Sequence, residues 1–124
     1  MYITNLDTIK SAEVPQTGKA GIPISVKWLL GEPEGAPNYE LRYLTFPVHA
    51  STLYHKHAWE HEVFIVKGQG ILKTRHDEIL LKDHDAILIL PGEEHQLLNR
   101  SETDTFDIIC VVPKGTRSFS CQCG

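Results

Sequence analysis

The sequence predicts an all-β fold of short antiparallel strands. Apolar residues show no helical period over any extended stretch. Short runs rich in β-branched and aromatic residues recur instead, and clusters of glycine, proline, aspartate and other polar residues separate them. Many short strands with regularly spaced turn signals are typical of an antiparallel sandwich or barrel.

Each expected strand comes from its own run of alternating or continuous apolar residues. These strands cover residues 24–30, 40–48, 63–67, 71–75, 79–82, 86–90, 96–99 and 106–112. Turns with glycine, proline or polar residues separate them, at residues 31–37, 67–70, 76–78, 83–85, 91–92 and 101–104.

The strands form one domain between an N-terminal arm and a C-terminal tail. We expect the barrel at residues 24–113, the arm at 1–23 and the tail at 114–124. Prolines and glycines between residues 15 and 23 interrupt any regular pattern in the arm. The arm either wraps the barrel or a neighbouring subunit, or it is a flexible N-terminus.

Composition and charge argue against several classes of partner. A chain of 124 residues is long enough for a single domain, and its formal net charge of −4 disfavours nucleic acid and anionic membranes, which attract basic surfaces. No apolar run is long enough to span a bilayer, and residues 1–10 lack a signal-peptide core, so we expect a cytoplasmic protein. Cys110, Cys121 and Cys123 do not make a disulfide framework and are expected to be thiols, the last two in a flexible, oxidisable tail.

Three of the seven histidines, His55, His57 and His61, fall close together in the chain. Residues two apart on a strand share a face, so the rings of His55 and His57 can bind one metal ion. The third ligand is one of Glu60, His61 and Glu62. His61 has the same parity as the first two histidines, an argument that weakens if the chain bends before it.

A fourth ligand has to come from elsewhere in the chain. His95 follows a proline–glycine turn and opens the strand expected at 96–99, so a closed barrel can bring it beside the first three. The sequence therefore predicts a site for one divalent transition metal at these four histidines, and the alternative is that they are solvated surface residues. His76 and His84 lie in polar turns and are expected at the surface, and His49 is not assigned to the site.

These residues resemble the two sequence motifs of the cupin superfamily. The first motif has a His-x-His pair, three or four residues, a glutamate, six residues and a glycine. Here His61 stands in the glutamate position, with six residues between it and Gly68. In the second motif, His95 matches the family's last histidine and Asn99 its asparagine. The family's leading glycine is absent, because His49 stands in its place.

The resemblance covers about residues 24–113 and implies an antiparallel jelly-roll barrel, also called a double-stranded β-helix. The four-histidine pattern is similar to a subgroup of small single-domain cupins. Such proteins commonly pair through sheet edges and N-terminal arms, so the resemblance also implies a homodimer with residues 1–30 in the contact.

Four neutral imidazoles would leave the full double charge on the ion, which could be manganese, iron, cobalt, nickel, copper or zinc. Octahedral coordination would leave two positions for water, dioxygen or substrate, whereas closed four-coordinate geometry would indicate structural zinc. Asn99 or a backbone carbonyl is expected to hold the tautomer of a ligand. Alternation along the strands predicts that the wall of an apolar substrate pocket consists of Phe46, Ile65, Phe106 and Cys110. The alternative is that these residues are plain core packing.

An open, nitrogen-rich metal site in a barrel is compatible with three functions. The first is a metal-dependent oxidoreductase, dioxygenase-like, acting on a small organic molecule. The second is a non-catalytic module that binds a metal or a small ligand. The third is a metal-assisted isomerase or lyase, for which Glu60 and Glu62 are the acid or base candidates; either could instead be a solvent-facing residue at a strand end.

Overall fold

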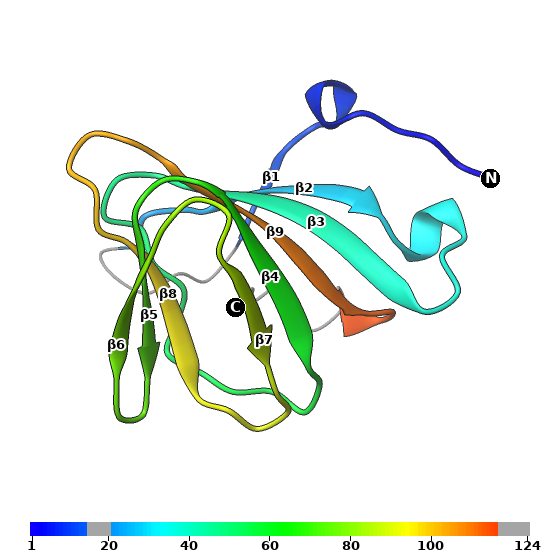
Figure 1. Ribbon diagram of the computed structural model, residues 1–124. Helices are drawn as coiled ribbons and strands as arrows, with labels where there is room; N and C mark the ends of the chain where they lie inside the picture. The colour runs from blue at the N-terminus through cyan, green and yellow to red at the C-terminus, as the bar shows by residue number, and fades with distance from the viewer. Residues whose placement is uncertain (15–20, 117–124) are drawn as a thin grey trace.

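Two antiparallel sheets form the domain in a computed structural model, which describes residues 1–14 and 21–116 (Figure 1). The strands are Ala12–Glu13 (β1), Ser25–Leu30 (β2), Tyr39–Phe46 (β3), His61–Lys67 (β4), Gly70–Thr74 (β5), Glu78–Leu81 (β6), Ala86–Ile89 (β7), His95–Asn99 (β8) and Phe106–Pro113 (β9). The larger sheet has the order β1-β2-β3-β9-β4-β7, and the smaller one β6-β5-β8. The described residues also include short 3-10 helices at Leu6–Thr8 (η1) and Glu32–Glu34 (η3). This arrangement confirms the predicted antiparallel all-β fold.

Strands β2 to β9 correspond to the eight expected strands, with ends displaced by one or two residues at most. The sequence does not predict β1, because a two-residue strand carries no periodic pattern. Ala12 and Glu13 pair with the beginning of β2, and the buried Val14 donates its N–H to the carbonyl of Ile24 at 2.8 Å. This part of the N-terminal arm therefore lies along β2 of the same chain. No described segment forms a helix with the length and apolarity needed to cross a membrane.

The two sheets pack through one cluster of buried apolar side chains. Alternation along each strand supplies the cluster, as in β3, where every second side chain is buried. Phe46 and Phe106 lie opposite each other on β3 and β9, and their rings meet edge to face with centroids 5.3 Å apart. Ile65 and Cys110 are also fully buried. All four residues expected along a pocket wall thus belong to the interior.

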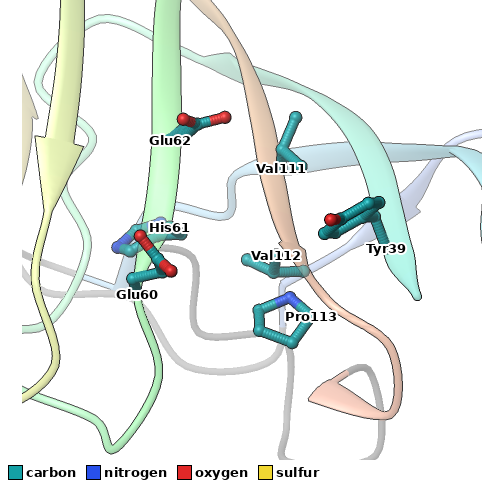
Figure 2. Close-up of a pocket in the computed structure, with 7 residues that line it drawn as sticks. All are labelled: Tyr39, Glu60, His61, Glu62, Val111, Val112 and Pro113. Carbon is teal, nitrogen blue, oxygen red and sulfur yellow. The ribbon is translucent and has the colours of Figure 1, made fainter.

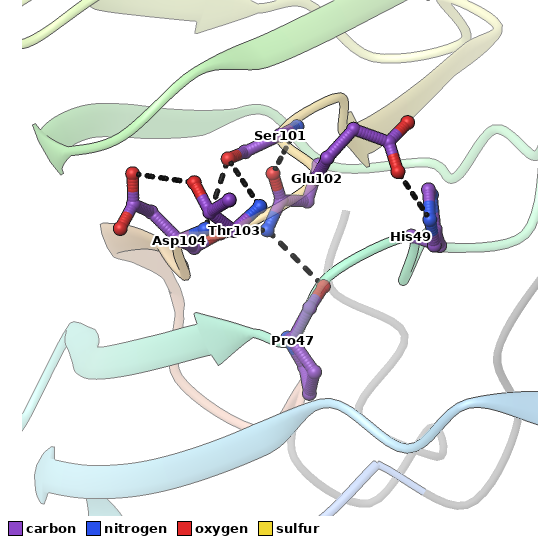
Figure 3. Close-up of polar contacts among 7 residues, drawn as sticks. Pro47, His49, Ser101, Glu102, Thr103 and Asp104 are labelled. Carbon is purple, nitrogen blue, oxygen red and sulfur yellow. Dashed lines mark hydrogen bonds and ion pairs between the residues drawn. The ribbon is translucent and has the colours of Figure 1, made fainter.

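A buried asparagine ties the loop after β8 to the end of β3 (Figure 3). The side-chain amide of Asn99 donates to the carbonyl oxygens of Pro47 at 3.1 Å and Asp104 at 2.8 Å. Its Oδ1 accepts from the backbone N–H of Ser101 at 2.8 Å. These contacts engage both ends of the amide, so of the two candidates for holding a histidine tautomer, Asn99 or a backbone carbonyl, Asn99 is not the one found.

Candidate metal centre

Segments from both sheets bring four histidines to one end of the domain. His61 is the first residue of β4 and His95 the first residue of β8, and Figure 1 shows these two strands starting at the same end of the molecule. His55 and His95 form an isolated antiparallel bridge, with N–H to carbonyl distances of 3.0 and 2.9 Å. His57 joins this group because its carbonyl accepts from the N–H of Gly92 at 2.8 Å.

The chain from His55 to His57 is not a regular strand, in contrast to the expectation. It bends at Ala58 and Trp59 before β4 begins, and the Trp59 ring stacks on His57 with centroids 4.5 Å apart and an interplanar angle of 4°. The side chain of His61 nevertheless faces the interior, at 1% exposure, so it still meets the histidine pair.

The ring nitrogens of the four histidines lie close together. One ring nitrogen from each of His55, His57 and His95 falls within 4.8 Å of the others. His61 Nε2 lies 3.4 Å from His95 Nε2, and the ring centroids of His57 and His61 are 4.7 Å apart. Two nitrogens bound to one zinc ion at about 2.0–2.1 Å can be separated by up to about 4.2 Å, so the distance between His61 and His95 suits a shared ion.

Backbone carbonyls orient three of the rings. The Nδ1–H groups of His55, His57 and His95 donate to carbonyl oxygens at 2.6, 3.0 and 2.8 Å, and each carbonyl lies two residues away in the chain. A carbonyl oxygen only accepts, so each neutral ring carries its hydrogen on Nδ1 and a lone pair on Nε2. These contacts supply the partner that metal-binding imidazoles need on their second nitrogen.

The environment of His55 tests whether a metal ion fits here. Its Nε2 atom is buried and has no hydrogen-bond partner among the described residues. Burial, together with smaller effects of the nearby His95, His57 and His61, lowers the pKa of His55 to about 4, against the opposing effect of the Leu53 carbonyl. A neutral imidazole with a buried lone pair is the state that binds a transition metal, so these residues fit a divalent ion.

A cavity of about 340 Å³ opens beside His61 (Figure 2). Glu60 and Glu62 are exposed side chains on its wall, and Figure 2 shows Glu62 and His61 leaving β4 in different directions. The described residues that line it are Tyr39, Glu60, His61, Glu62, Val111, Val112 and Pro113. At the cavity, Tyr39 of β3 pairs with Pro113 of β9. Phe46 and Phe106 pair at the other end of these two strands.

Two further residues lie near the centre: Cys110, which the sequence predicts as a pocket-wall residue, and Arg42, which is absent from the predicted site. Cys110 Sγ lies 3.2 Å from His61 Nδ1, and Arg42 Nη2 lies 3.5 Å from the same sulfur. Arg42 is 2% exposed, and its guanidinium lies over Trp28, 5.2 Å from the ring centroid. The alternation of β3 could have indicated that Arg42 faces inward, because Arg42 lies two and four residues before the buried Leu44 and Phe46.

The remaining histidines lie outside this cluster. His76 and His84 are exposed in turns, as expected. His49 Nε2 lies 3.1 Å from a carboxylate oxygen of Glu102, at the loop shown in Figure 3.

The fold has known counterparts among solved structures. The polyketide cyclase RemF from Streptomyces resistomycificus is similar with a TM-score of 0.80 and 23% identity, over 91% of this chain and 79% of that chain. A predicted oxalate decarboxylase from Thermotoga maritima is similar with a TM-score of 0.77 and 17% identity, over 91% of this chain and 99% of that chain. A cupin 2 conserved barrel domain protein from Rhodopseudomonas palustris follows with a TM-score of 0.71 and 24% identity, over 86% of this chain and 72% of that chain. At these identities the similarity shows the fold.

Sequence comparison supplies the family. None of the curated proteins compared with the chain matches it significantly. The family described as "Cupin domain" matches residues 42–112, which is more than half of the chain and includes all four clustered histidines. On this match, with the fold that accompanies it, the chain belongs to the cupin domain family.

Proposed function

We propose that the chain is a metal-dependent oxidoreductase, dioxygenase-like, that acts on a small organic molecule. It would bind one divalent transition metal through a ligand set of His55, His57, His61 and His95. The observation that supports this most is that ring nitrogens of His55, His57 and His95 lie within 4.8 Å of one another, in rings oriented by backbone carbonyls, with His61 Nε2 3.4 Å from His95 Nε2. Rings held in this way need little rearrangement when an ion binds.

The donor set defines what this site could do. An ion bound only by neutral imidazoles keeps its double charge, and it supplies a Lewis acid for an anionic group and, if redox-active, an electron acceptor or donor. The chain's own residues orient the ligands, and one of these ligands, His61, also lines the cavity of about 340 Å³. The stacked Trp59 covers one face of the His57 ring and excludes water from it.

A metal-assisted isomerase, lyase or cyclase is the second candidate. Glu60 and Glu62 line the cavity beside His61, where a carboxylate could take a proton from a substrate carbon or oxygen. The solved polyketide cyclase with the same fold is a precedent for such chemistry, although a shared fold alone does not assign a reaction.

Elemental analysis of untagged protein, purified without added metal, tests the metal site. We expect about one divalent transition ion per chain. His57→Ala should lower metal affinity at least about tenfold, because it removes one of the converging ligands. His76→Ala is the matched control, since it changes an exposed turn histidine outside the cluster. If metal-free protein takes up none of manganese, iron, cobalt, nickel, copper and zinc, the proposal is rejected.

Oxygen consumption separates the candidate reactions. Protein loaded with iron, manganese or copper would be given a panel of phenols and diketones, with uptake expected for the oxidoreductase. Substrate conversion without oxygen uptake, reduced by Glu60→Gln or Glu62→Gln, would instead establish the isomerase or lyase. Binding detected by calorimetry without any chemical change would replace both with a non-catalytic binding module.

A further inference from the structure

His61 differs from the other three clustered histidines in the partner of its Nδ1 atom. Theirs are backbone carbonyls, whereas His61 Nδ1 faces the sulfur of Cys110 at 3.2 Å. The strand register explains this contact, because Cys110 of β9 pairs with Val63 of β4 and so lies diagonally across from His61 on the inner face. Both side chains are buried, His61 at 1% exposure and Cys110 at 0%.

A carbonyl and a thiol restrict a histidine ring differently. The carbonyl oxygen only accepts a hydrogen bond, so it permits one neutral tautomer of the ring. A thiol can donate through S–H or accept through sulfur, so it can partner either tautomer. Among these four histidines, His61 is therefore the one that can change tautomer while keeping its Nδ1 contact.

The neighbouring His95 selects the tautomer of His61 while no ion is bound. His95 donates its Nδ1–H to the carbonyl of Glu93 at 2.8 Å, so its neutral ring presents a lone pair at Nε2. His61 Nε2 lies 3.4 Å from that atom, and two lone pairs at this distance would repel each other. The hydrogen of His61 therefore resides on Nε2, and the thiol of Cys110 donates to Nδ1.

We propose, on the basis of the metal site proposed above, that Cys110 is a positioning residue that allows His61 to change tautomer when the ion binds. His61 Nε2 can offer a lone pair to an ion only when the ring hydrogen is on Nδ1 instead. The sulfur of Cys110 then accepts a hydrogen bond from Nδ1–H. Ring and thiol keep the same total number of hydrogens, so the change needs no oxidant, no reductant and no net release of a proton.

Arg42 holds the sulfur in place in both states. It pairs directly with Cys110 across β3 and β9, and its Nη2 donates to the sulfur at 3.5 Å. A guanidinium has donors and no acceptor, so the S–H hydrogen cannot be directed at Arg42 and is available to His61. The Trp28 ring under the guanidinium fixes the position of Arg42 in turn.

Nitrogen-15 NMR of the histidine rings tests the change directly, in full-length protein before and after zinc is added. We expect His61 to carry its hydrogen on Nε2 without zinc and on Nδ1 with zinc, while His55 keeps its hydrogen on Nδ1 throughout. If His61 already carries its hydrogen on Nδ1 in the metal-free protein, the proposal is overturned. This measurement needs no variant, so it does not depend on whether a substituted chain folds.

Variants at Cys110 distinguish hydrogen bonding from packing. Cys110→Val removes the hydrogen-bonding group, and we expect zinc affinity, measured by chelator competition, to fall about 10–100-fold. Cys110→Ser retains a group that donates and accepts, so it should bind zinc nearly as tightly as wild type. Ile108→Val, a conservative change on the inner face of the same strand, is the packing control and should bind zinc like wild type.

The two proposals fail in distinguishable ways. Unchanged zinc affinity in Cys110→Val would overturn the role of Cys110 and leave the metal site intact. A wild-type protein that binds no zinc would overturn the metal site and, with it, this role.

Discussion

Tyr43 and Asp107 form a short hydrogen bond between β3 and β9, in which the tyrosine hydroxyl donates to the carboxylate at 2.5 Å. Burial raises the pKa of Tyr43 above its ordinary value of 10, and the hydrogen bond and the negative charge of Asp107 raise it further. The Nζ of Lys67 lies 4.0 Å from the same carboxylate oxygen. The folded chain therefore keeps the phenol protonated at alkaline pH.

This shift predicts how stability depends on pH. Above about pH 10 the unfolded chain loses the tyrosine proton while the folded chain retains it, so the folded state binds more protons. The stability that this bond contributes is present below pH 10 and is lost as the pH rises toward the higher folded-state pKa. Urea unfolding of wild type and Tyr43→Phe should therefore show that the substitution reduces the loss of folding stability at alkaline pH.

The exposed Tyr39 provides the control for that experiment, since Tyr39→Phe should leave the alkaline loss unchanged. At neutral pH, Tyr43→Phe should cost about 1 kcal/mol for the lost hydrogen bond. Parallel alkaline profiles for wild type and Tyr43→Phe would contradict the expectation.

Among the elements, the turn between β4 and β5 depends on a glycine of the first motif. Gly68 has a φ of +110°, and a Cβ added there would lie 2.5 Å from the carbonyl oxygen of Thr105 and 2.9 Å from the Cα of Phe106. Its N–H donates to Asp83 at 2.8 Å. The absence of a side chain therefore lets this turn pack against the beginning of β9.

Alanine substitution at two glycines separates the backbone effect from the steric one. Gly68→Ala should destabilise the metal-free protein by about 2–5 kcal/mol, from a disfavoured φ and a clash with backbone atoms. Gly35→Ala should cost only about 1–2 kcal/mol, because Gly35 has a φ of +87° but nothing within 4 Å of the added Cβ. Denaturant unfolding measures both changes, and equal losses would show that the clash is relieved by movement of the turn.

For the whole molecule, the β7 edge of the larger sheet bears on the homodimer that the resemblance implies. The larger sheet ends at β1 on one side and at β7 on the other. Phe64 and Leu88 lie near the β7 edge with exposed fractions of 42% and 55%, beside a groove of about 430 Å³. Within residues 1–14 and 21–116, no strand pairs with the outer side of β7, and apolar side chains at an unpaired sheet edge are typical of contact surfaces.

We predict that the chain forms a homodimer through this edge. Sedimentation of wild type at micromolar concentration should show a dimer, and Leu88→Lys should shift it toward monomer because a charge would be buried in the contact. Leu80→Lys is the matched control, since Leu80 is 64% exposed on β6 of the smaller sheet. A monomeric wild-type protein would contradict the prediction, and a dimer unaffected by Leu88→Lys would place the contact elsewhere, for example at the N-terminal arm.

The strands and most of the histidine cluster followed from the sequence, because both depend on local spacing. A period of two reports which side chains face inward, and turn residues mark where each strand ends. The same parity grouped His55, His57 and His61, and the two motifs added His95. The structure places all four rings together, although the stretch before β4 bends instead of forming a strand.

The partners of those rings depended on the tertiary structure. His61 and Cys110 are 49 residues apart, and their contact follows from the register of β4 against β9. Arg42 reaches the same sulfur through the register of β3 against β9, 68 residues away in the chain. Local periodicity indicates the face of the strand on which a side chain lies. It does not indicate which distant strand pairs with that strand, or in which register. For this reason the sequence alone determined strands β2 to β9 and the candidate ligands, and only the assembled sheets decided which groups hold those ligands.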